Sequence, residues 1–129
     1  MTKAISLLFL LSAPMHGAIF DVTAFGAKHD GKTLDREAIN QAVQAAAAAG
    51  GGTVYFPPGT YLTGSIRLRS NITLQFEPGA TLEAASDPAA YDAAEPNQWT
   101  QFQDFGHSHW HNSLIWGEEI ENVAMSGAA

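Results

Sequence analysis

The sequence predicts an all-β protein whose short strands stack as the coils of a solenoid, with one α-helix capping the first coil. The first observation is a repeat, because segment 54–62 matches segment 74–82 at a step of 20 residues and places Phe56 and Phe76 at the same position. Such a period is typical of stacked coils. The second is that the strand-like runs lie too close together for crossover helices. The third is that a single amphipathic segment precedes them.

The region after residue 18 is expected to begin with a strand and a polar loop. Ile19–Ala24 alternates apolar and polar residues, which favours a strand that 25–27 closes. The polar run His29–Thr33 predicts a loop, with a turn at Asp30-Gly31.

A helix is expected to follow this loop. Asp35 is a good N-cap residue, Glu37 suits the positive end of the helix dipole, and Gly50–Gly52 ends the helix. One face is apolar: Ala38, Ile39, Ala42, Val43 and Ala46. We expect this helix to cover the open end of the first coil, which would otherwise expose apolar side chains and unpaired strand edges. An ordinary surface helix is the alternative.

The strands are expected to follow in quick succession, at residues 53–56, 61–68 in one or two pieces, 72–76, 80–83, 113–116 and 120–125. In the 20-residue repeat Phe56 should stack on Phe76, and Leu62 corresponds to Leu82. Asn71 and Asn122 begin similar runs and predict the same corner one coil apart. The irregular segment 84–112 is therefore interpreted as an insertion in a repeat, and long loops of this kind are often functional.

Residues 1–18 have the pattern of a secretory signal peptide, with Lys3 before the apolar run 4–11 and small residues at 14–18. The apolar run is much shorter than the ~20 residues that span a membrane. We therefore expect two parts: a signal peptide at 1–18 and the N-terminal part of a solenoid domain at 19–129.

Composition limits the function classes. The formal net charge is −7, so the chain is a poor candidate for nucleic-acid binding. There is no cysteine, so packing and not disulfides must stabilise an exported product. These features favour a secreted or periplasmic bacterial protein without a membrane span.

Several segments carry a family resemblance: Phe20–Ala27, Asp30-Gly31, Gly50–Val54, Pro57–Leu62, Gly79–Leu82, Ser113–Ile115 and Glu121–Val123. Together they resemble the N-terminal region of pectin-degrading glycoside hydrolases of the polygalacturonase type, family 28. The resemblance implies a right-handed parallel β-helix and inverting hydrolysis of galacturonic-acid polymers. It also implies an acidic plant polysaccharide as partner and no cofactor.

Inverting hydrolysis needs a carboxylic acid and a carboxylate base ~6.5–9.5 Å apart. The resemblance implies that these groups would lie in four motifs of the family: Asn-Thr-Asp, Asp-Asp, Gly-His-Gly and Arg-Ile-Lys. None occurs here, since Gly106-His107 precedes Ser108 and Ile66-Arg67 precedes Leu68. We therefore assign no catalytic residue, and expect an inactive fragment that lacks the coils carrying the active site.

The run that most suggests a binding site is His107-Ser-His-Trp-His111. In an extended segment its three histidines would share one side. Lining of a sugar groove by His107, His109, Trp110 and His111, binding of a divalent metal, and ordinary loop packing all remain open. Because two-residue spacing is a weak metal signal, no metal site is assigned.

Other side chains have two interpretations each. Arg67 and Arg69 alternate to one side of a strand and either meet an acidic polymer or act as exposed strand charges that discourage edge pairing. Trp99 and Trp110 could stack on sugars, whereas Trp116 lies on a strand and is expected to be structural or buried. The acidic residues of the insertion have a spacing that fixes no acid/base pair: Asp87, Asp92, Glu95 and Asp104.

The sequence therefore favours the N-terminal part of an exported polygalacturonase-like hydrolase. A non-catalytic β-helix module that binds polysaccharide is the main alternative. A lyase that uses Ca²⁺ and an Arg or Lys base is the third, and it needs an acidic cluster on facing coils that these residues do not supply.

Overall fold

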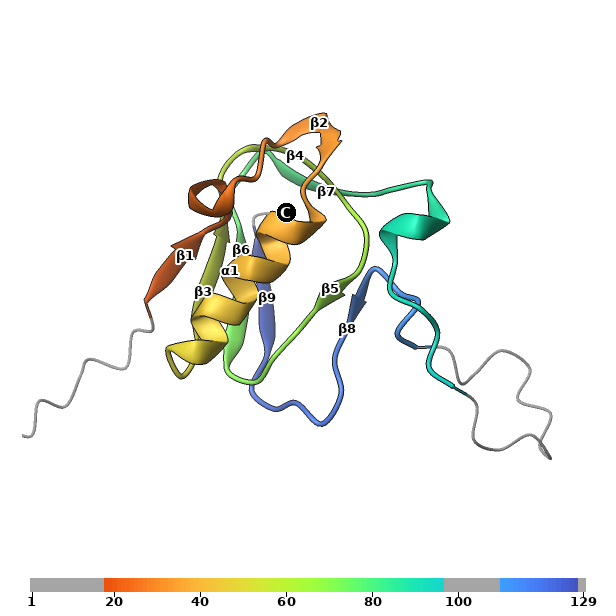
Figure 1. Ribbon diagram of the computed structural model, residues 1–129. Coiled ribbons are helices and arrows are strands. Elements are labelled where there is room, and N and C mark those ends of the chain that lie inside the picture. The colour runs from red at the N-terminus through yellow and green to blue at the C-terminus, as the bar shows by residue number, and fades with distance from the viewer. Residues whose placement is uncertain (1–17, 97–109, 128–129) are drawn as a thin grey trace, which may run out of the picture.

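The computed structural model describes residues 18–96 and 110–127, and in this part the chain winds as a parallel β-helix (Figure 1). The elements in chain order are β1 (Ile19–Asp21), the 3₁₀ helix η1 (Val22–Phe25), β2 (Asp30–Leu34), α1 (Arg36–Ala48), β3 (Gly52–Phe56), β4 (Gly59–Thr63), β5 (Ile66–Arg67), β6 (Ile72–Phe76), β7 (Ala80–Ala84), the 3₁₀ helix η2 (Pro88–Ala90), β8 (Ile115–Trp116) and β9 (Ala124–Gly127). The predicted signal peptide lies outside the described residues, apart from its last residue.

Strands of successive coils pair in parallel. The sheet orders in the described part are β1-β3-β6-β9, β2-β4-β7 and β5-β8. A full coil therefore consists of β3, β4 and β5, in that order. In the first coil β1 and β2 correspond to β3 and β4, and helix α1 takes the place of β5. The strand predictions for β3 to β8 agree with these elements to within a few residues. The last strand is shifted, since β9 begins at Ala124 and continues to Gly127.

The 20-residue register holds along one side of the coil. Phe56 pairs with Phe76 in the β3/β6 ladder, and their rings stack with centroids 4.4 Å apart at 18°. Both the register and the predicted stacking are confirmed.

The register moves by one residue at the next corner. Tyr61, not Leu62, lies opposite Leu82 in the β4/β7 ladder, so the predicted equivalence of Leu62 and Leu82 was wrong. The cause is that three residues separate β6 from β7, whereas only two separate β3 from β4. A slip of one residue exchanges the two faces of a strand, and Tyr61 is the residue that enters the core. Its hydroxyl donates to the Pro57 carbonyl at 2.6 Å, and burial raises the pKa of Tyr61 to about 12.

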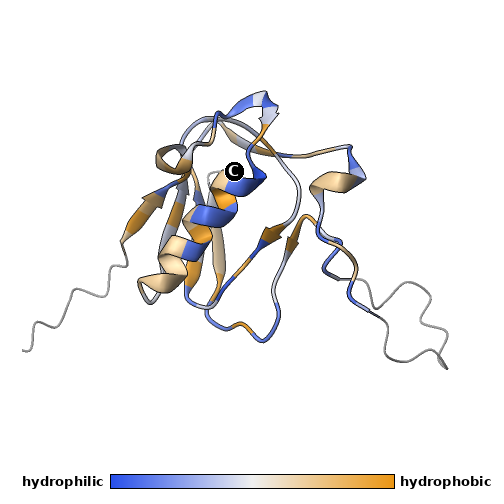
Figure 2. Cartoon of the chain, in the orientation of Figure 1, coloured by the Kyte–Doolittle hydropathy of each residue, from blue (hydrophilic) through white to orange (hydrophobic). Residues whose placement is uncertain are grey.

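Helix α1 lies across the end of the first coil and packs on β1, β3, β5 and η1 (Figure 1). The five apolar residues predicted to form its inner face are all buried: Ala38, Ile39, Ala42, Val43 and Ala46. Hydrophobic and hydrophilic residues alternate along its ribbon (Figure 2). The capping role is confirmed, because this face closes the core formed by Val54, Ile66 and their neighbours.

Two local predictions before the helix were wrong. The first strand stops at Asp21, whose carboxylate accepts hydrogen bonds from the Thr23 amide at 2.8 Å and the Thr23 hydroxyl at 2.6 Å. These local bonds favour the 3₁₀ turn over further strand. The expected loop His29–Thr33 contains most of strand β2, because β4 supplies parallel pairing partners for Asp30 and Leu34. Pairing partners from a distant strand override a polar local sequence.

Asp35 occupies the predicted N-cap position, but its side chain does not cap the helix. Its carboxylate is 2% exposed and accepts from the backbone N–H groups of Lys28 at 2.8 Å and His29 at 3.0 Å. The buried charge is thus satisfied by the chain that leads into β2 and not by the helix it precedes.

The repeated corner is confirmed. Asn71 and Asn122 both have positive φ, 64° and 57°, and the Asn122 side-chain amide donates to the Asn71 side-chain oxygen at 3.0 Å. Asparagine tolerates this left-handed backbone better than most residues. Within residues 18–96 and 110–127, no helix is long and apolar enough to cross a membrane.

Candidate functional site

The start of the insertion packs against the corner between β4 and β5. The Ser65 amide donates to the Ala90 carbonyl at 3.2 Å, and Gly64 lies so close to Ala90 that a β-carbon would overlap the backbone of η2. Only glycine allows this approach without moving the chain. The corner therefore anchors the start of the insertion.

Ser65 joins both ends of the insertion to the coil. Its side chain is fully buried, and its hydroxyl donates to the Ser113 carbonyl at 2.7 Å while accepting from the Asp92 amide at 2.8 Å. Residues 92 and 113 are thereby held on one side chain although 21 positions separate them.

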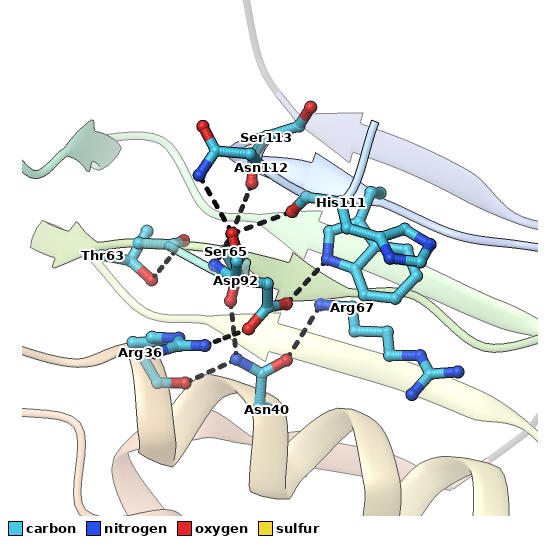
Figure 3. A network of polar contacts seen from close by, with 11 residues as sticks. Arg36, Asn40, Thr63, Ser65, Arg67, Asp92, His111, Asn112 and Ser113 are labelled. Atoms are coloured by element: carbon cyan, nitrogen blue, oxygen red, sulfur yellow. Dashed lines mark hydrogen bonds and ion pairs between the residues drawn. The ribbon is translucent and has the colours of Figure 1, made fainter. Parts of the chain in front are cut away.

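Asp92 is the centre of a polar network (Figure 3). One carboxylate oxygen pairs with the Arg36 guanidinium of α1, and the other accepts from the Trp116 indole N–H of β8 at 2.8 Å. Its backbone carbonyl accepts from the Asn112 side-chain amide at 3.0 Å. A single residue of the insertion thus fixes a helix and a strand relative to each other.

Asn40 of α1 completes the edge of β5. Its side-chain oxygen accepts from the Arg67 amide at 2.9 Å, and its side-chain nitrogen donates to the Ser65 carbonyl at 2.9 Å and to the Arg36 carbonyl at 2.9 Å. Figure 3 shows this side chain between the helix and the strand. The amide takes the place of a strand partner from the first coil for two backbone groups of this edge, the Ser65 carbonyl and the Arg67 N–H.

A groove of about 460 Å³ lies between α1, the β5/β8 side and the insertion. Its lining residues are Arg36, Glu37, Asn40, Gln44, Arg67, Arg69, Asp92 and Trp116. All three arginines of the chain are in this set, although the chain as a whole has a net charge of −7. Arg36 is paired with Asp92, whereas Arg67 and Arg69 have no carboxylate within ion-pair distance among the described residues.

Trp116 connects Arg67 to the insertion. The Arg67 guanidinium carbon lies 4.9 Å from the centre of the indole, within the range of cation–π attraction. The His111 ring stacks on the same indole, with centroids 3.9 Å apart at 28°. Because Trp116 contacts both side chains and donates to Asp92, the half-buried indole holds Arg67 in place. The expectation of a structural Trp116 is met in this form.

Glu95 fastens the other end of the insertion. Its two carboxylate oxygens accept from the consecutive amides of Trp110 at 2.7 Å and His111 at 3.0 Å. Burial acts to raise the pKa of Glu95, but the hydrogen bonds from these amides, together with the nearby His111 ring, lower it to about 2. The His111 ring nitrogens lie 3.8 Å from Glu95 and 3.5 Å from Glu118.

Of the four predicted sugar-binding residues, the structure describes two, Trp110 and His111. His107 and His109 lie outside the described residues. Trp110 is 64% exposed and is not among the residues that line the groove, and His111 reaches the groove only through its stack on Trp116. No group of three or more His, Cys, Asp or Glu residues placed to hold a metal occurs in the part of the chain that the structure describes.

Sequence reasoning did not single out Arg36 or Asn40, and it named Asp92 only among the acidic residues of the insertion, without a role. Arg36 and Asp92 are 56 positions apart, and Asn40 meets Arg67 across 27 positions. The available signal was the arginine content: three arginines in an acidic chain, two of them only two positions apart.

Comparison with known proteins agrees with this fold. Residues 19–127 match the family described as rhamnogalacturonase A/epimerase, pectate lyase-like. A probable polygalacturonase of Vitis vinifera is 31% identical over 121 residues, which are 91% of this chain and 24% of the plant protein. Alginate lyase 7 of Azotobacter vinelandii is 46% identical over 61 residues, 41% of this chain and 7% of that protein.

Among solved structures, a family 28 exopolygalacturonase of Yersinia enterocolitica superposes with a TM-score of 0.67 at 31% identity. The match covers 84% of this chain and 19% of that enzyme. The chain thus spans a quarter or less of the length of these three proteins. The resemblance to polygalacturonases and the right-handed β-helix fold are confirmed. The chain belongs to the pectate lyase-like family of rhamnogalacturonase A and the epimerases.

Proposed function

We propose that this chain forms the capped first coils of an exported glycoside hydrolase that acts on pectin-type polysaccharides, and that these coils bind the polymer without cleaving it. The observation that carries the proposal is the groove in which all three arginines gather on an acidic protein. Guanidinium groups match carboxylates in geometry and charge. A galacturonic-acid polymer presents one carboxylate on each sugar, which suits such a groove.

Two carboxylates of the insertion, Asp92 in the groove and Glu95 beside His111, do not suit hydrolysis. A general acid needs a raised pKa so that it holds its proton at working pH. The pKa of Glu95 is lowered to about 2, and both carboxylate oxygens of Asp92 are engaged by Arg36 and Trp116. These two groups serve the structure, which supports binding without cleavage.

The test combines binding with a cleavage assay on the 129-residue chain. Short oligogalacturonates should bind, and polygalacturonate incubated with the chain should gain no reducing ends. Arg67→Gln should weaken binding about tenfold, since charge-assisted hydrogen bonds contribute about 1.5–3 kcal/mol. Lys32→Gln removes the same charge from exposed strand β2, away from the groove, and is the matched control. Release of reducing ends by the chain would contradict the proposal, and so would failure to bind.

A non-catalytic binding module is the second candidate, and the same groove favours it. The two candidates differ in a longer protein built on this chain. If a chain extended by further coils hydrolyses polygalacturonate, the hydrolase is supported. If the extended chain binds the polymer but does not cleave it, the binding module is supported.

Export is part of the proposal and rests on the apolar run 4–11 behind Lys3. Mature protein should begin at Ile19 when its N-terminus is sequenced. Intact Met1 on protein confined to the cytoplasm would contradict export.

A further inference from the structure

We infer that the groove recognises the carboxylate of a uronic acid and not the configuration of its sugar ring, so that it accepts galacturonate and mannuronate polymers alike. This inference rests on the proposed function, since it names the ligand class of the same groove. It follows from which polar groups of the lining are already occupied.

The donors and acceptors best placed to identify hydroxyl groups are used internally. The Asn40 amide makes three hydrogen bonds to backbone groups. The Trp116 indole N–H is taken by Asp92, and the Asp92 carboxylate is taken by Trp116 and Arg36. A site discriminates hydroxyl configuration by hydrogen bonds that an isomer leaves unpaired, and these groups are not available for that purpose.

The remaining groups are mainly charges. Arg67 is exposed, and its guanidinium carbon lies 4.9 Å from the centre of the indole, within the range of cation–π attraction. Its N–H groups form a planar fork that matches a carboxylate. Arg69 lines the same groove two residues beyond Arg67, past the end of β5. Gln44 is an exposed amide at the rim, and the Glu37 carboxylate already accepts from Gln41 at 3.3 Å. The polar groups of the groove that can still bind a ligand are therefore mainly Arg67 and Arg69, and both bind negative charge.

This arrangement selects a chemical class. Galacturonate and mannuronate share a carboxylate on a pyranose ring and differ in configuration at C2 and C4, and their polymers also differ in the configuration of the glycosidic linkage. Methyl esterification removes the charge and leaves the ring unchanged. The groove should therefore distinguish the ester from the acid more strongly than it distinguishes one acid from the other.

The experiment measures affinities of the 129-residue chain for three matched probes by calorimetry: oligogalacturonate, oligomannuronate and methyl-esterified oligogalacturonate of equal length. We expect the two acids to bind within about threefold of each other and the ester to bind about tenfold or more weakly, as expected for the loss of a charge-assisted contact. Affinity for the acids should fall with added salt.

Variants locate the effect. Arg67→Gln should weaken both acids by the same factor. Arg67→Lys should recover only part of the loss, because an ammonium keeps the charge but lacks the planar fork of N–H donors that pairs with a carboxylate. Lys32→Gln should leave all three affinities unchanged, and circular dichroism of each variant confirms that it folds.

The outcomes separate the inference from the proposed function. Mannuronate that binds more than about threefold more weakly than galacturonate overturns the inference while the proposed function stands. An ester that binds as well as the acid also overturns it, because the ring and not the charge is then recognised. Binding of neither acid overturns the proposed function itself.

Discussion

Two sides of the coil are built differently. Along the β3/β6 side, β3 and β6 pair at a step of 20 residues and identical side chains stack, as Phe56 does on Phe76. Along the β5/β8 side, the strands have two residues each, a helix stands in for the first strand, and an insertion separates the second from the third. The step from β6 to β9 is 51 residues, against 20 from β3 to β6. The groove lies on this irregular side.

The difference shows where a solenoid acquires a site. A regular ladder places like residues above like residues, so it builds a core and cannot gather unlike side chains. On the irregular side Arg36, Arg67 and Asp92 come from a helix, a strand and the insertion, and they meet because each element departs from the repeat. Stability is therefore expected to depend more on the regular side, and binding more on the irregular one.

The largest effect is expected on the regular side. Phe56→Ala removes a fully buried ring that contacts both Phe76 and Tyr61, and should cost about 3–5 kcal/mol in the free energy of unfolding. Urea denaturation measures the loss. Phe76→Ala is the matched control: it breaks the same stack from a residue that is only partly buried, and should cost less. Equal losses would show that the stack itself, and not burial, sets the stability of this side.

The next largest loss of stability is expected at Gly64, where the insertion is anchored to the coil. Gly64→Ala forces the chain away from Ala90 and should cost about 1–3 kcal/mol, the usual range for overpacking. The loss should come with weaker oligogalacturonate binding, since Ser65 and Asp92 lie on the same anchor. Gly127→Ala is the control, because its new β-carbon would make only ordinary contacts with Phe76 at 3.5 Å. Unchanged binding in Gly64→Ala would separate the anchor from the groove.

A smaller effect is expected where the helix replaces a strand. Asn40→Ala leaves the Arg67 amide and the Ser65 carbonyl without their partner, at a cost of about 1–2 kcal/mol. Hydrogen exchange at the Arg67 amide should accelerate in this variant. Gln41→Ala changes the adjacent exposed side chain and should leave that exchange rate unaltered. A slow Arg67 amide in Asn40→Ala would mean that another group closes the edge.

The regular side was predictable and most of the irregular side was not. The spacing of Phe56 and Phe76, the apolar face of α1 and the Asn71/Asn122 corner are periodic or local patterns, so sequence alone exposes them. The one-residue slip that places Tyr61 opposite Leu82 depends on the length of a corner, which residue identity does not reveal. Strand β2 depends on pairing partners in β4, and its polar sequence suggests a loop.

The candidate site was predictable only in its chemistry. Arg67 and Arg69 stood out as charges on one face of a predicted strand, and both line the groove. The strand itself ends at Arg67, so the prediction that Arg69 lies on it was wrong. Their setting was hidden, because Asp92 meets Trp116 across 24 positions and Arg36 across 56. Long-range side-chain contacts leave no mark in local periodicity, whereas composition does record that an acidic chain keeps three arginines.

The smallest effect concerns pH and the far end of the insertion. The amides of Trp110 and His111 bind the ionised form of Glu95, whose pKa falls from 4.5 to about 2 in the folded chain. Because the folded pKa lies below the unfolded one, this carboxylate adds stability above about pH 4.5, and that contribution disappears as the pH falls towards 2. Glu95→Gln should therefore be less stable than the parent chain at neutral pH, with the difference shrinking through this window.

Urea unfolding at a series of pH values measures this dependence. Glu118→Gln is the control, because Glu118 is 64% exposed and meets the protein through the His111 ring at 3.5 Å. Exposed pairs of this kind contribute little, so the control should follow the parent chain through the acid range. Glu95 lies on the irregular side and away from the repeat, so its loss should change stability less than the loss of Phe56 does.

A parent chain and Glu95→Gln that lose stability in parallel between pH 4.5 and 2 would place the acid-sensitive contact elsewhere. Asp30 is then the next carboxylate to test, because backbone amides of Thr33 and Lys32 also lower its pKa to about 2.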